Sequence, residues 1–179
     1  MTSDTLTESA GTALDAAAVE RVGANEPQWL RERRQHAWEV YERTPMPTTR
    51  LEEWRYTNLK KKLDLDALRF SDAEALSSDP TTWPPQLRAA MDEDREASGH
   101  IVIIDGHVVH ADVDEGLAAK GVILESLHDA ITNHEVLVQE HLATEAVPAE
   151  EGKFAALNAA LWNDGIFLFV PRGVRLEQP

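Results

Sequence analysis

Apolar side chains recur at helical spacing between residues 26 and 43. Trp29, Ala37 and Val40 are separated by charged side chains, which predicts an amphipathic helix with one packed face. Asn25 can cap this helix, because its side chain can accept a hydrogen bond from the free N–H groups of the first turn. The same criteria predict further helices over residues 15–22, 86–98, 125–132, 135–144 and 154–162.

Two apolar runs on either side of Asp105-Gly106 predict a β-hairpin. Residues 101–104 and 107–110 would form its strands, joined by a type I′ turn, which needs positive φ at both central positions. In this register residue 104 faces 107 and residue 102 faces 109. Both faces of the hairpin are then largely apolar, which indicates that both are covered. Further extended segments are predicted at residues 63–70, 121–124, 166–170 (a buried strand) and from residue 174 onward.

The segment from residue 45 to 59 combines prolines, aromatic side chains and a neighbouring basic cluster. Its two prolines end the preceding helix, because each fixes φ and lacks a backbone donor. Thr49 and Glu52 have the spacing of a capping box, which predicts the start of another helix. We expect the following aromatic residues, Trp54 and Tyr56, to pack rather than to take part in chemistry.

Charge is distributed unevenly along the 179 residues, whose net charge is −15. Residues 1–28 have a net charge of −4, residues 29–70 of +3 and residues 71–179 of −14. The overall sign disfavours binding of nucleic acid by the whole chain, because an acidic surface repels phosphate. The basic stretch is either a solvated helix of mixed charge or a docking face for an acidic surface. That surface would belong to a partner or to the chain's own acidic half.

Composition excludes several classes of protein. The apolar fraction of 42% is sufficient for a globular core, and the absence of cysteine excludes disulfides, thiol nucleophiles and thiolate metal sites. The sequence has no apolar run of the roughly 18 residues that a membrane-spanning helix needs. Residues 1–24 are polar and acidic and lack the pattern of a secretory signal. A cytoplasmic protein is therefore expected.

Histidine is the residue type that first suggests a metal site. His100, His107 and His110 cluster in the sequence, but alternation along a strand places His107 and His110 on opposite faces of the predicted hairpin. His100 falls at the far end of the ladder, so the three imidazoles do not converge on one ion. His134 and His141 are seven residues apart on a predicted helix, about 10 Å along its axis, which is too far to share an ion.

The sequence contains no phosphate-binding loop, no dinucleotide-binding glycine motif and no nucleophile elbow. No combination of nucleophile, base and oxyanion donor can be assembled from it. We therefore predict no catalytic, cofactor-binding or metal-binding residues in this chain, and no enzymatic activity.

Four segments in order along the chain carry a resemblance to a known family. They are Pro47, Arg50, Glu53, Trp54, Arg55, Tyr56 and Thr57; the hairpin at 101–107; residues 121–127; and residues 154–158 with 165–174. Together they are similar to the N-terminal region of the SufB/SufD family of iron–sulfur cluster assembly proteins, most closely its SufD branch. The spacing within the first segment matches the family signature approximately, and the resemblance covers about residues 26–179.

The resemblance implies an α+β fold. An N-terminal helical region with a small β-hairpin and α/β portion would run into the first strands of a truncated right-handed parallel β-helix. Residues 1–24 would be a flexible acidic lead-in, residues 25–164 the N-terminal domain and residues 165–179 the start of the β-helix. A strand beginning at residue 174 also indicates that the chain is a piece of a longer protein, because a lone strand is marginally stable.

The resemblance implies a function as well. The leading hypothesis is a non-catalytic accessory domain of a SufD-like component of the SufBCD iron–sulfur cluster assembly complex, with a scaffold or partner-contact role. Its partners would be SufB- and SufC-like proteins, bound through the full-length parent, and a homodimer is also open; no membrane or nucleic-acid partner is expected. The parent complex would handle the clusters, and this segment would hold no cofactor. The alternatives are an independent acidic protein-binding module, a small enzyme or metal protein using His107 and His110, and the SufB paralogue.

Overall fold

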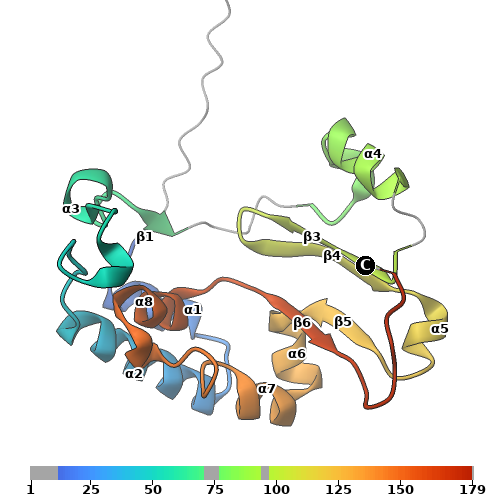
Figure 1. Ribbon diagram of the computed structural model, residues 1–179. Helices are drawn as coiled ribbons and strands as arrows, with labels where there is room; N and C mark the ends of the chain where they lie inside the picture. The colour runs from blue at the N-terminus through green and yellow to red at the C-terminus, as the bar shows by residue number, and fades with distance from the viewer. Residues whose placement is uncertain (1–11, 71–76, 94–96, 179) are drawn as a thin grey trace, which may run out of the picture. The chain divides into compact units, whose positions relative to one another are not determined.

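The structure of the chain is a computed structural model that describes residues 12–70, 77–93 and 97–178 (Figure 1). Backbone contacts divide the chain into two compact units. Unit 1 comprises residues 1–72 with 139–162, and unit 2 comprises residues 73–138 with 163–179. The described residues form helices and three two-stranded antiparallel sheets, so the α+β class predicted from the sequence is confirmed. None of the helices in these described ranges is both long and apolar enough to cross a membrane.

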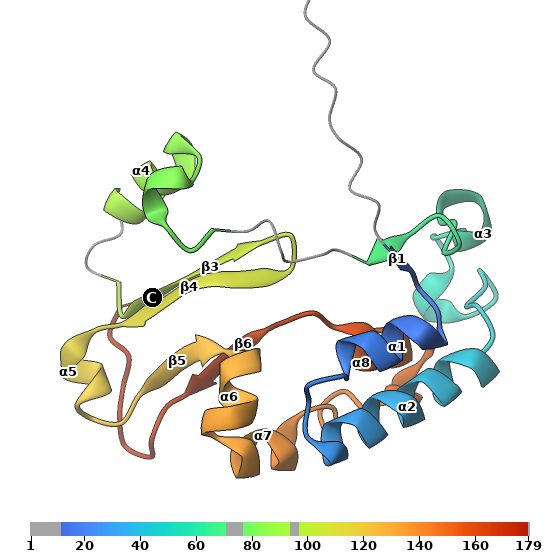
Figure 2. The same ribbon diagram turned by 180° about the vertical axis from the view of Figure 1, so that it is seen from behind.

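Unit 1 is built on three helices that pack together, α1 (Ala16–Val22), α2 (Gln28–Arg43) and α8 (Lys153–Leu161) (Figure 2). Small side chains make close packing possible, and Ala156 and Ala160 of α8 are completely buried. The core of this unit also contains the following side chains: Ala18, Val19, Ala37, Val40, Ala149, Ala159 and Leu161. All three helices were predicted from the spacing of apolar residues, and their boundaries agree within two residues.

The start of α2 differs from the prediction. Pro27, not Asn25, occupies the cap position, and no side chain bonds to the first turn there. Asp15 does cap α1, because its carboxylate accepts a hydrogen bond from the backbone N–H of Ala18 at 2.8 Å.

Short elements complete unit 1. Strand β1 (Thr12–Ala13) pairs antiparallel with β2 (Arg69–Phe70), so only the end of the predicted extended segment 63–70 is a strand. Between α2 and β2 lie the 3₁₀ helix η1 (Glu52–Trp54) and the single turn α3 (Leu59–Lys62). A second 3₁₀ helix, η4 (Ala149–Glu151), leads into α8. Residues 1–11 of the predicted lead-in lie outside the described residues, and the domain boundaries after residues 24 and 164 stay predictions.

Unit 2 contains the predicted hairpin, formed by β3 (Gly99–Ile104) and β4 (His107–Val113). The φ angles of Asp105 and Gly106 are 49° and 85°, as a type I′ turn requires. Ile104 pairs with His107 as predicted, but a β-bulge next to Val102 shifts the rest of the register. Val102 therefore pairs with His110, and the predicted pairing of residue 102 with 109 is wrong, because the bulge adds one residue to β4.

The second sheet of this unit pairs β5 (Ile123–Ser126) with β6 (Ile166–Phe169). The strand predicted at 166–170 is confirmed as β6, but its predicted burial is wrong, since Ile166 and Leu168 are 51% and 52% exposed. These side chains share one face of β6, and alternation leaves that face open. Within residues 171–178 the structure has no strand, so the strand predicted from residue 174 is not formed there. The parallel β-helix stays a prediction.

Short helices fill the rest of unit 2. The 3₁₀ helix η3 (Pro80–Thr82) precedes α4 (Pro85–Glu93). Residues 71–76, and residues 94–96 of the helix predicted over 86–98, lie outside the described residues. The remaining helices follow the hairpin and β5; they are α5 (Glu115–Ala118), α6 (Leu127–Asn133) and α7 (Glu135–His141), the last of which extends past Val138 into unit 1.

Candidate functional site

The segment that carries the family resemblance begins where α2 ends. The hydroxyl of Thr44 donates a hydrogen bond to the carbonyl of Val40 at 2.6 Å, and the backbone of Thr44 is extended. Pro45 and Pro47 follow and have no N–H with which to continue the helix. The predicted end of this helix at the prolines is confirmed, and Pro47 is buried in unit 1.

The turn that follows is closed by Thr48, and the predicted capping box of Thr49 and Glu52 is wrong. The side-chain oxygen of Thr48 accepts a hydrogen bond from the backbone N–H of Arg50 at 3.3 Å. Leu51 is the residue before η1 and makes no side-chain cap. A capping box needs its acidic residue at the third helical position, whereas Glu52 is at the first position of η1.

The two aromatic residues of this segment have different surroundings. The ring of Trp54 lies against the ring of Phe154 on α8, with centroids 5.4 Å apart and planes at 40°. Its predicted packing role is confirmed. Tyr56 is 89% exposed, so the same prediction is wrong for Tyr56. Its ring is contacted by the guanidinium of Arg55, 5.9 Å from the ring centroid.

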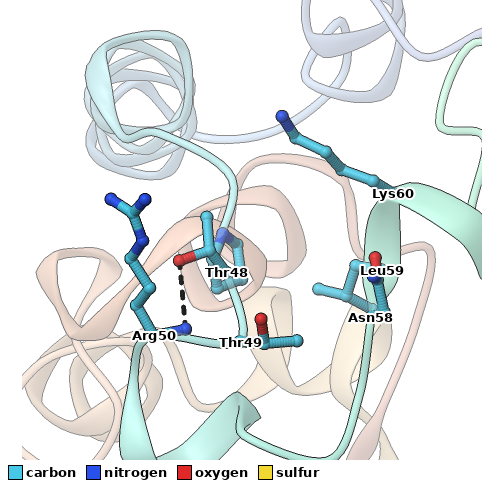
Figure 3. A pocket seen from close by; sticks show the side chains of 7 residues that line it. Thr48, Thr49, Arg50, Asn58, Leu59 and Lys60 are labelled. Atoms are coloured by element: carbon cyan, nitrogen blue, oxygen red, sulfur yellow. Dashed lines mark hydrogen bonds between the residues drawn. The ribbon is translucent and has the colours of Figure 1, made fainter.

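A first pocket of about 360 Å³ lies between the turn at residues 47–50 and the start of α3. We call it the cationic pocket. Figure 3 shows Arg50 and Lys60 on opposite sides of it, with the two threonines between them. The lining residues are Pro47, Thr48, Thr49, Arg50, Asn58, Leu59 and Lys60.

A second, larger hollow of about 690 Å³ adjoins the first, and we call it the apolar groove. The two hollows share the lining residues Pro47 and Thr48, so they are neighbours in unit 1. The apolar lining of the groove includes Met46, Leu51, Trp54 and Phe154. Two carboxylates, of Glu53 and Glu151, also line it.

The two cations of the cationic pocket have no acidic partner within ion-pair distance among the described residues. Other basic side chains nearby are already engaged. Arg55 pairs with Glu52 at 3.0 Å. Lys153, which lines the apolar groove, donates to the carbonyl of Tyr41 at 2.6 Å, and burial lowers the pKa of its ammonium group. Arg50 and Lys60 are therefore the groups at this site that can bind an anion.

The structure places the histidines of the hairpin differently from the sequence prediction. Because the bulge shifts the register, His100 and His110 lie on one face of the sheet with Asp112 between them. The imidazole of His110 is 2.7 Å from Oδ1 of Asp112 and that of His100 is 3.3 Å from Oδ2. The predicted separation of His100 from His110 is wrong. Asp112 was missed, although its position two residues after His110 on one strand was a usable signal.

The remaining histidines do not join this cluster. His107 contacts the side-chain amide of Asn163 at 3.3 Å. His134 ends α6 and stacks on Phe167 at 5.4 Å, so the prediction that it shares one helix with His141 is wrong. In the described part of the chain, no group of three or more His, Asp or Glu side chains is arranged to hold a metal ion.

Comparison with known proteins identifies the region that this chain matches. A family model described as the SufBD protein N-terminal region matches residues 12–179. This range contains unit 2, all of unit 1 except residues 1–11, the cationic pocket and the apolar groove.

Individual relatives agree with the family match. The chain is 33% identical over 157 residues to the iron–sulfur cluster assembly protein SufD of Bacillus subtilis, which covers 86% of the chain and 34% of that protein. It is 28% identical over 168 residues to the iron–sulfur cluster assembly protein SufB of the same organism. This alignment covers 86% of the chain and 33% of SufB. An iron–sulfur cluster assembly SufBD family protein of Mycobacterium tuberculosis is 29% identical over 189 residues. This alignment covers 99% of the chain and 21% of that protein. The chain thus spans about a third or less of these relatives.

Proposed function

The chain belongs to the SufB/SufD family of iron–sulfur cluster assembly components, and from this premise we propose that it is the N-terminal accessory region of a SufD-like member. Its role is to support the scaffold and to contact partner proteins, without catalysing a reaction itself. The observation that carries the proposal is the family match over residues 12–179, together with the relative named SufD. The protein acts in the cytoplasm, and iron–sulfur clusters are the cargo of the complex that contains it.

The surface chemistry of unit 1 supports a contact role. Tyr56 is almost fully exposed and Leu51 is 49% exposed. The cationic pocket of the same unit holds two cations without acidic partners in the described ranges. Exposed aromatic and arginine side chains are typical of protein interfaces. The partners proposed are SufB- and SufC-like proteins, which the full-length protein binds in one complex.

Co-purification tests this proposal. The full-length protein containing this chain is tagged and expressed with the SufB- and SufC-like proteins of the same organism. The molar mass of the eluted complex is then measured by light scattering. The expected result is one complex that contains all three proteins. A tagged protein that stays monomeric while all three are folded would contradict the proposal.

A SufB-like identity is the second candidate, favoured by the comparable match to SufB, 28% identical over 168 residues. The two identities differ in the partner that they require. A SufD-like protein pairs with a SufB-like protein, whereas a SufB-like protein pairs with a SufD-like one. Mixing the purified protein separately with each paralogue, and measuring which heterodimer forms by size-exclusion chromatography, decides between them.

A further inference from the structure

We infer that the cationic pocket and the apolar groove together bind a peptide segment of a partner protein, one that carries grouped carboxylates beside leucine-like or aromatic side chains. This inference rests on the proposed partner-contact role and names the chemistry of the partner. Pro47 and Thr48 line both hollows, so one extended segment that crosses these two residues can reach both.

The acidic half of the segment fits the cationic pocket. Arg50 and Lys60 line the pocket on opposite sides, so each cation can bind one of the grouped carboxylates (Figure 3). The hydroxyl of Thr49 and the amide of Asn58 line the same space and can add hydrogen bonds. The guanidinium and ammonium groups have no acidic partner among the described residues, so binding breaks no ion pair there.

The apolar half of the segment fits the groove. Met46, Leu51 and Trp54 line it and offer contacts for leucine-like or aromatic side chains. Glu53 and Glu151 line it as well and would repel a carboxylate placed there. The site therefore selects a segment whose acidic and apolar residues are separated, and it orients that segment with its acidic end at Lys60.

Charge complementarity favours an acidic peptide over other occupants. Residues 29–70 carry a net charge of +3, although the whole chain carries −15. A long polyanion such as nucleic acid meets the repulsion of the whole protein, whereas a short acidic segment meets only the local basic surface.

Fluorescence anisotropy tests the inference with labelled synthetic peptides and the full-length protein. The block peptide has its glutamates in one half and its leucine and phenylalanine residues in the other. A second peptide of the same composition has its glutamates interspersed, and a third is the block peptide with glutamine in place of glutamate. We expect the block peptide to bind more tightly than both, with an affinity that falls as salt is raised.

Paired variants locate the binding site. The double variant Arg50→Gln with Lys60→Gln should bind the block peptide about tenfold more weakly, because two charge-assisted contacts are lost. The matched control, Arg172→Gln with Arg175→Gln, removes the same charge from exposed positions in unit 2 and should bind within about twofold of the wild type.

Several outcomes would overturn the inference. They are absence of block-peptide binding at low salt, equal binding of the glutamine peptide, and equal loss of affinity in the two double variants. Displacement of the peptide by an oligonucleotide, or self-association that the Arg50/Lys60 variant abolishes, would identify a different occupant and would also overturn it. Co-purification with SufB- and SufC-like proteins despite any of these results would leave the proposed function standing.

Discussion

Arg34 and Glu26 form a bidentate ion pair inside unit 1. Nε and Nη2 of Arg34 each donate to one oxygen of the Glu26 carboxylate at 2.7 Å, and the two residues are only 1% and 8% exposed. The third nitrogen donates to the carbonyls of Ala160 and Trp162 at 3.1 Å each. The pair thus binds α2 to the end of α8 and satisfies carbonyls that the helix leaves free.

Replacing Arg34 by methionine should destabilise the protein by about 3–5 kcal/mol, because Glu26 would remain as a buried charge without its partner. Urea unfolding of the variant measures the change. The double variant with Glu26→Gln should recover part of the loss.

Arg43→Met is the control for this variant, since the Arg43 side chain is 61% exposed and its nearest carboxylate is 4.0 Å away. It should change the free energy of unfolding by no more than about 0.5 kcal/mol. If the two substitutions lowered the free energy of unfolding equally, burial of the Arg34–Glu26 pair would not be the cause of the loss.

Gly99→Ala should destabilise unit 2 by about 1–3 kcal/mol through overpacking. A Cβ at this position would lie 2.5 Å from the carbonyl oxygen of Asp112 and 2.9 Å from a methyl carbon of Leu124. The hairpin backbone or β5 must then move, which faster amide hydrogen exchange in β3 and β4 would report.

Gly23→Ala provides the comparison, because Gly23 has a φ of −77° and its Cβ would approach no atom closer than 3.3 Å. Its effect should stay within about 0.5 kcal/mol. If amide hydrogen exchange in β3 and β4 were unchanged in the Gly99→Ala variant, the overpacking proposed at Gly99 would be contradicted.

Ser126→Ala should cost about 1–2 kcal/mol by removing the cap of α6. The Ser126 hydroxyl oxygen accepts the backbone N–H of Asp129 at 2.9 Å and donates to its carboxylate at 2.8 Å, and the serine is buried. Thermal or urea unfolding measures the loss. Thr132→Ala, at an exposed position of the same helix, should have an effect within about 0.5 kcal/mol, and a similar loss there would argue against capping.

The hydrogen bond between His36 and Glu150 should be visible in the acid titration of the protein. The pKa of Glu150 is lowered from its ordinary value of 4.5, chiefly by the hydrogen bond from the His36 ring at 2.7 Å. A lowered carboxyl pKa stabilises the folded state fully above pH 4.5, and that contribution is lost as the pH falls through the lower, folded value.

In His36→Ala the titration midpoint of Glu150, followed by NMR of its carboxyl carbon, should rise toward 4.5. His128→Ala, which removes an exposed histidine of unit 2, should leave that midpoint unchanged. A midpoint that does not move in the His36 variant would refute the assigned cause.

The elements with a strong local pattern could be predicted from the sequence. The helix predicted over 26–43 is α2 (Gln28–Arg43), and the one predicted over 154–162 is α8 (Lys153–Leu161). The turn at Asp105-Gly106 has the positive φ angles that its residues favour. Each of these features depends on residues close together in the chain, so the information is present in the sequence.

The candidate site was predicted only in part. The segment at 45–59 and its basic neighbours were singled out, and Trp54 packs as expected. The exposure of Tyr56 and the carboxylates that line the groove could not be predicted, because Glu151 comes from a part of the chain about one hundred residues away. The bulge that brings His100 and His110 to Asp112 also escaped prediction, since it depends on how two strands pair.

By itself, the sequence determined the helical periodicities, the hairpin turn, the uneven distribution of charge and the resemblance to a family. The tertiary structure alone decided which of these elements meet. Arg34 bonds to the carbonyl of Ala160, 126 residues away, and β5 pairs antiparallel with β6 across a long intervening segment. Such contacts arise because burial and hydrogen bonding act between surfaces that come together only when the chain folds, and no local pattern specifies the partner.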